Sequence, residues 1–87
     1  MKFAESRIYA DPENAARRLI EIANAIEPVH DGRIYIELVN VRFLYQDRGT
    51  PAEYGAGMQL AIERGWLMLH ESGTYVKFTP AGAELFA

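Results

Sequence analysis

The hydrophobic pattern near the start of the chain predicts an amphipathic helix over residues 12–26. Asp11 can cap the first turn, and Pro12 suits the first helical position. Pro28 disfavours helical geometry at the residue before it, so the helix should end there. Within these bounds apolar residues recur at steps of three and four, which places them on one side of the helix: Ala16, Leu19, Ile20, Ala23 and Ile26.

A further helix is predicted over residues 50–64 by the residues at its ends. Thr50, Pro51 and Glu53 match a capping box with proline at the first helical position, and Gly65 suits a left-handed C-cap. Gly55 and Gly57 are expected to allow close packing, at about 1 kcal/mol each relative to alanine. One side should hold Tyr54, Gly57, Met58, Ala61 and Ile62, and the other Ala52, Ala56, Gln59, Leu60 and Glu63.

The segment between these helices combines a strand pattern with an ambiguous one. Residues 33–37 alternate with β-branched and aromatic side chains, which is typical of a short strand. Residues 38–47 also alternate, but we interpret residues 39–47 as a short helix with Asn40 as its cap. In a helix, Phe43 and Leu44 lie one turn after Asn40 and Val41 and on the same side.

The end of the chain is typical of a β-hairpin followed by a helical turn. Residues 66–70 and 74–79 are strand-like, and Ser72-Gly73 suits a two-residue turn. The resulting register places His70 opposite Tyr75 and separates an apolar face from a water-tolerant one. The apolar face holds Leu67, Leu69, Val76 and Phe78, and the other holds Met68, His70, Tyr75 and Lys77. Trp66 should be a core anchor, and Thr79-Pro80 should open a last turn.

The order of helix, short strand, helix, helix and hairpin resembles a winged helix-turn-helix domain, which is an α+β fold. Residues 60–67 resemble the end of a recognition helix, and residues 76–82 resemble the second wing strand of MarR-type regulators. The resemblance covers roughly residues 12–87 as one domain. It implies three helices, a short strand and a C-terminal β-hairpin wing. Residues 1–11 are expected to be an N-terminal arm, and Phe3, Ile8 and Tyr9 could pack as this arm or as a segment swapped with a partner.

Composition narrows the classes of function. The 87 residues contain no cysteine, which excludes disulfides, zinc ribbons and thiol nucleophiles. The chain has no apolar run as long as a membrane span and no signal peptide at its start, so we expect a cytoplasmic protein. Neither His30 nor His70 has the spacing of a metal site. Because nucleophile elbows and phosphate-binding loops are also missing, we expect neither an enzyme nor a cofactor.

The winged-helix resemblance implies double-stranded DNA as a partner, with residues 50–64 in the major groove and the hairpin turn against phosphates. Gln59 could pair with adenine. The charge balance argues against DNA binding, because the chain has 9 Lys+Arg and 12 Asp+Glu and its net charge is -3. Residues 50–63 contain no Lys or Arg at all.

Two functions therefore stay open. The first is a DNA-binding transcription regulator that acts as a dimer, and we rank it first by a narrow margin. The alternative is a winged helix for protein–protein interaction or homodimerisation, which uses the low-charge side of residues 50–64 with Met68 or the arm. The candidate binding residues are Arg42, Arg48, Thr50, Ala52, Ala56, Gln59, Leu60, His70, Tyr75 and Lys77, with Arg64 as a further nearby base.

Overall fold

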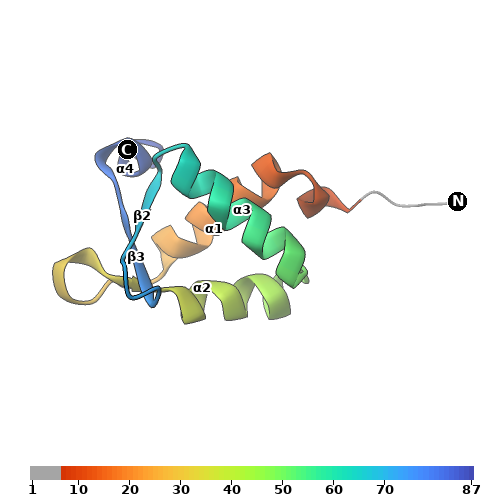
Figure 1. The fold of residues 1–87 in the computed structure, drawn as a ribbon, viewed down its shortest axis with the longest axis horizontal. Coiled ribbons are helices and arrows are strands. Elements are labelled where there is room, and N and C mark those ends of the chain that lie inside the picture. Colours follow the sequence, from red (N-terminus) through yellow and green to blue (C-terminus); the bar gives the residue numbers. More distant parts are fainter. Residues whose placement is uncertain (1–6) are drawn as a thin grey trace, which may run out of the picture.

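The computed structural model describes residues 7–87, which form an α+β fold. The helices are α1 (Pro12–Ala25), α2 (Ile36–Val41), α3 (Pro51–Glu63) and α4 (Pro80–Glu84), and the strands are β1 (Ile34–Tyr35), β2 (Leu67–Leu69) and β3 (Tyr75–Phe78). Two short 3₁₀ segments are η1 (Ile8–Ala10) and η2 (His30–Gly32), and a π-helical segment, η3 (Arg42–Gln46), continues α2. The strands form an antiparallel sheet in the order β1-β3-β2 at one end of the helices (Figure 1).

The predicted first helix is confirmed as α1, with its N-terminal cap as expected and its end one residue earlier than predicted. The Asp11 carboxylate accepts from the backbone N–H of Glu13 at 2.9 Å, and Pro12 occupies the first helical position. The predicted apolar side is buried, and Ala15 and Ile22 are buried with it. The buried face is therefore wider than a single stripe, because α1 contacts several other elements.

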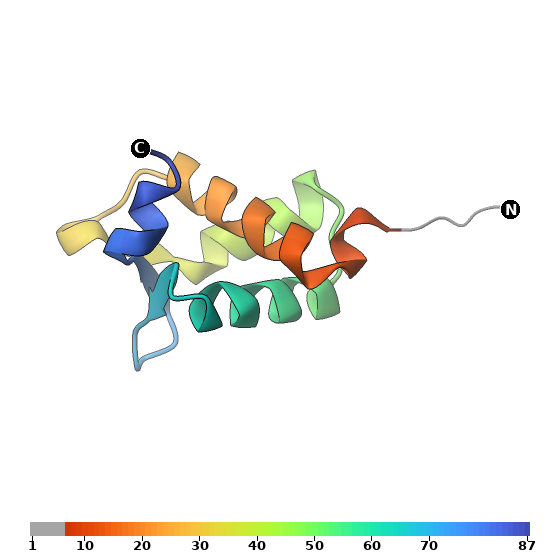
Figure 2. The ribbon, with the colours of Figure 1, turned by 90° about the horizontal axis from the view of Figure 1, so that it is seen from above.

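Helices α1 and α3 lie side by side (Figure 2) and meet through small residues. A Cβ atom at Gly57 would lie 2.8 Å from the Cβ of Ala15 and 3.0 Å from Leu19 Cδ1, so glycine permits this close approach. The predicted packing role of Gly57 is therefore confirmed. The same prediction for Gly55 is wrong, because a Cβ there would meet nothing within 4 Å.

Helix α2 begins three residues before the position that the sequence predicted. Strand β1 covers only Ile34–Tyr35, and Tyr35 is the N-cap of α2 without a side-chain capping bond. Asn40 is therefore inside the helix and is not its cap. The helical spacing of Ile36, Val39 and Phe43 turns these side chains toward the core, with Val39 and Phe43 fully buried. This burial decides against the competing strand pattern of residues 38–47.

The hairpin has the predicted register, but its turn is placed differently. Leu67 lies opposite Phe78, and Leu69 lies opposite Val76. The backbone N–H of Gly73 donates to the carbonyl of His70 at 2.9 Å, so Glu71 and Ser72 are the central residues of the turn. Gly73 follows them with the positive φ of 76° that glycine adopts without strain. The predicted turn at Ser72-Gly73 is wrong by one residue.

The predicted apolar face of the hairpin reaches the core only at its base. Leu67 and Val76 are buried and Phe78 is half-buried, as expected. Leu69 is exposed, contrary to the prediction, because it lies toward the turn on edge strand β2.

Trp66 and α4 close the base of the hairpin. Trp66 is buried, as predicted, and its carbonyl accepts from the backbone N–H of Thr79 at 3.1 Å. The hydroxyl of Thr79 caps α4 by accepting from the N–H of Gly82 at 2.9 Å. A Cβ at Gly82 would lie 2.0 Å from the carbonyl oxygen of Trp66, so α4 packs directly on this backbone.

An ion pair joins the segment before α1 to the start of α3. The Arg7 guanidinium donates to both carboxylate oxygens of buried Glu53, at 2.7 and 2.8 Å, and to the carbonyl of Arg48. Glu53 also completes the predicted capping box by accepting from the N–H of Thr50 at 3.0 Å. The bonds from Arg7 are the main reason why the pKa of Glu53 lies at about 2.

The two helical glycines of α3 form a matched pair for a stability test. Gly55→Ala should stabilise the protein by about 1 kcal/mol, because alanine favours helix and the site is open. Gly57→Ala should destabilise it by about 1–3 kcal/mol through overpacking against Ala15. Urea unfolding of both variants would measure the difference. Equal effects of the two substitutions would contradict the assigned α1–α3 contact.

The Arg7–Glu53 pair should make the free energy of unfolding depend on pH. Because the folded-state pKa of Glu53 is lowered from 4.5 to about 2, the unfolded chain takes up a proton first as the pH falls. The stabilising effect is therefore present above pH 4.5 and is lost between pH 4.5 and 2. Urea unfolding of Glu53→Gln and Arg7→Met at several pH values should show a weaker loss over this interval than the wild type. Parallel profiles for all three proteins would refute the coupling.

Candidate functional site

The outer side of α3, the predicted reading surface, is exposed but carries no base. Ala52, Ala56, Gln59 and Glu63 are all exposed there. The side-chain amide of Gln59 donates to the Glu63 carboxylate at 3.1 Å. The one polar group that could read adenine is thus already bonded to an acid of its own helix.

Two other predicted contact residues on α3 are used by the fold. Leu60 is half-buried and packs against the core, so the prediction that it lies on the open side is wrong. The Thr50 hydroxyl accepts from the backbone N–H of Glu53 at 3.1 Å, which occupies it as a helix cap. The apolar contact surface predicted on α3 is therefore reduced to two alanines.

The bases nearest α3 do not gather at one place. Arg64 donates to the Glu13 carboxylate at 2.6 Å, and its guanidinium lies 5.5 Å from the centre of the Trp66 ring. Arg48 precedes the first turn of α3, whereas Lys77 lies on the hairpin that follows its last turn (Figure 1). Since α3 has 13 residues, these two positions are separated by about 20 Å along the helix.

Tyr75, predicted on the water-tolerant face of the hairpin, is buried between two other side chains. The ring of His70 stacks on it with centroids 4.3 Å apart, and the Arg33 guanidinium lies 4.7 Å from its centre. His70 stays exposed and accepts from the backbone N–H of Ser72 at 3.1 Å. Tyr75 thus organises the hairpin through its ring and is not free to contact a partner.

The structure exposes an apolar surface that the sequence analysis did not identify. Leu38 is 48% exposed, Val41 47% and Tyr45 77%. Their spacing of three and four residues along α2 and η3 places them on one side of the helix, and we call them the α2 face. The sequence signal was this spacing, but the predicted helix began at residue 39 and left Leu38 outside it.

Arg42, on η3 beside the α2 face, is half-buried. Within residues 7–87, the side chains of Arg42, Arg48 and Lys77 have no ion-pair partner. The ion pairs of that part of the chain use Arg7, Arg17, Arg18 and Arg64 instead. The candidate bases are therefore not held in ion pairs within residues 7–87, but they are spread over η3, the loop before α3 and β3.

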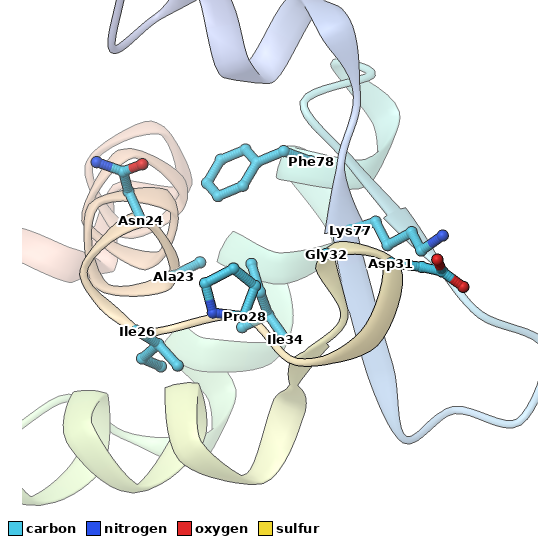
Figure 3. Close-up of a pocket in the computed structure, with 9 residues that line it drawn as sticks. All are labelled: Ala23, Asn24, Ile26, Pro28, Asp31, Gly32, Ile34, Lys77 and Phe78. Carbon is cyan, nitrogen blue, oxygen red and sulfur yellow. The ribbon is translucent and has the colours of Figure 1, made fainter.

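A hollow of about 240 Å³ lies between the end of α1, the η2 turn and β3 (Figure 3). Apolar side chains such as Ile26, Ile34 and Phe78 line it. The charged ends of Asp31 and Lys77 lie together on one side of it and point away from the hollow. The hollow therefore suits an apolar group. The ionisable side chains at the rim of the hollow do not converge on a point inside it.

Other classes of site have no support in the described part of the chain. Within residues 7–87 there is no group of three or more His, Asp or Glu side chains that could hold a metal ion. No helix in this range has the length and apolar character needed to cross a membrane. Comparison of the chain with family models, curated proteins and solved structures finds no match.

Proposed function

We propose that this chain is a protein-binding module with a winged-helix arrangement, and that the α2 face is its contact surface. The observation that carries the proposal is the exposure of Leu38, Val41 and Tyr45 on one side of a single helix. The proposal assigns the chain no catalytic step. It keeps the protein-interaction hypothesis of the sequence analysis but moves the surface from α3 to α2.

Physical chemistry favours a partner on the α2 face. Burying apolar surface stabilises an interface by roughly 25 cal/mol for each Å² removed from water. A tyrosine as exposed as Tyr45 adds a large, rigid ring with a polar end, which is the kind of side chain that dominates interface energies. The outer side of α3, with Ala52 and Ala56, has much less apolar area to offer.

The α+β architecture is compatible with a winged helix and explains how α2 comes to be available. Residues of α2 and η3 on the inner side, Val39 and Phe43, are fully buried, so this helix is fixed to the core. Figure 1 places α2 along one border of the molecule, away from α4 and the C-terminus. A rigid helix held in this way presents its outer side chains without a further ordering cost.

Site-specific photocrosslinking in the native host would test the proposal. A photoreactive amino acid in place of Tyr45 should give an adduct of discrete mass, and adding Leu38→Asp should reduce the yield of that adduct about tenfold. The matched control is the same photoreactive group in place of Ala56, on the outer side of α3. Adducts from position 56 but not from position 45 would overturn the choice of surface.

Duplex DNA is the second candidate, because Arg42, Arg48 and Lys77 are not held in ion pairs among residues 7–87. In this alternative the chain acts as a regulator that contacts phosphates with these side chains. The acidic net charge of -3 works against it, since affinity for DNA depends on neutralising phosphates.

A salt titration with random duplex DNA would test this second candidate. If Arg48 and Lys77 each contact a phosphate, log K should fall less steeply with log salt in the variant with both changed to alanine. The magnitude of the slope should decrease by about two. Arg64→Ala is the control, because Arg64 is bound to Glu13. Absence of duplex binding at low salt, or an unchanged slope in the double variant, would remove the DNA candidate.

A further inference from the structure

Opposite charges lie at the two ends of the α2 face. Glu37 is exposed in the first turn of α2, and exposed Arg48 follows the end of η3. Neither side chain has an ion-pair partner within residues 7–87. Between them Leu38, Val41 and Tyr45 are exposed and apolar, and exposed Gln46 and half-buried Arg42 are the polar neighbours of this face. The surface therefore has an acidic end, a mainly apolar middle and a basic end.

We propose that the partner of the α2 face is a second copy of this chain, with its α2 and η3 antiparallel to those of the first. This inference rests on the proposed function and names the partner. An antiparallel copy brings Glu37 of each chain toward Arg48 of the other, twice in one dimer, whereas a parallel copy would place like charges together. Antiparallel helix dipoles favour the same arrangement.

The spacing of the apolar side chains suggests one register for this pair. A two-fold axis between positions 41 and 42 places Leu38 of one chain opposite Tyr45 of the other, and brings the two Val41 side chains together at the centre. Arg42 of each chain, which is half-buried, then lies beside the centre. Because Leu38 lies opposite position 45 of the second copy, the two Leu38 residues are offset by seven residues. At 1.5 Å for each residue, this offset is about 10 Å along the helix. Each copy contributes the same residues to the interface, as two-fold symmetry requires.

The size of the surface predicts a dimer that depends on concentration. A contact built on one short helix lies below the roughly 800 Å² per partner that stable complexes bury. Dissociation at low concentration and association at high concentration are therefore expected, and sedimentation over a concentration series should show both.

Single-cysteine variants would test the arrangement directly, because the chain has no cysteine of its own. Under mild oxidation, Val41→Cys alone should form a disulfide-linked dimer. Leu38→Cys and Tyr45→Cys should each stay monomeric alone, because their cysteines lie beyond the roughly 4.4–6.8 Å Cα separation of a disulfide, and should cross-link when mixed. Cross-linking of Leu38→Cys with itself would instead show a parallel pair and overturn the proposal.

A charge reversal adds a control that does not touch the apolar residues. Glu37→Arg and Arg48→Glu should each weaken cross-linking of the mixed cysteine variants, and the two reversals together should restore it. Failure of the double reversal to restore it would overturn the antiparallel pairing. A monomer at every concentration would reject the second copy as partner, whereas a photocrosslinked adduct of another protein at position 45 would leave the proposed function standing.

Discussion

The close contact of α1 with α3 is the constraint on which the rest of the structure depends. Gly57 and Ala15 allow the two helices to approach so closely that a single added methyl group would lie 2.8 Å from its neighbour. The pair holds much of the buried apolar surface, including Leu19, Met58 and Ala61. With α1 and α3 in this position, α2 can bury only its inner side, through Val39 and Phe43. The exposed α2 face follows from this packing.

The starts of α1, α3 and α4 were predictable because their capping signals are local, whereas α2 has no side-chain capping bond and its start was missed. Asp11, Thr50 and Thr79 each cap a helix through bonds to residues two or three positions away, so the sequence contains both partners. The hairpin register was predictable because the alternation of apolar and water-tolerant residues specifies it, although the turn itself was misplaced by one residue. The winged-helix resemblance and both functional hypotheses stay predictions.

The exposures that decide the candidate site depend on long-range contacts, and the sequence pattern did not reveal them. Tyr75 is buried because Arg33, more than forty residues earlier in the chain, covers its ring in addition to the predicted neighbour His70. Leu60 is half-buried because the core extends around the side of α3. The pairing of Arg7 with Glu53 joins segments 46 residues apart and leaves no periodic trace in the sequence. In each case the partner was too distant for spacing arguments to find.

The distribution of charge connects the fold to the choice between partners. Arg7, Arg17, Arg18 and Arg64 form ion pairs with acids of the same chain. The Arg17 pair lies within α1, and the other three join α1 or α3 to segments distant in sequence. Four of the eight Lys and Arg side chains of residues 7–87 are thus used in ion pairs, and the others do not gather at one place. The outer apolar side chains of α2 are not used by the fold, because the inner side of that helix already satisfies the core. An exposed apolar face, together with bases that are spread over the molecule, favours a protein partner over a polyanion.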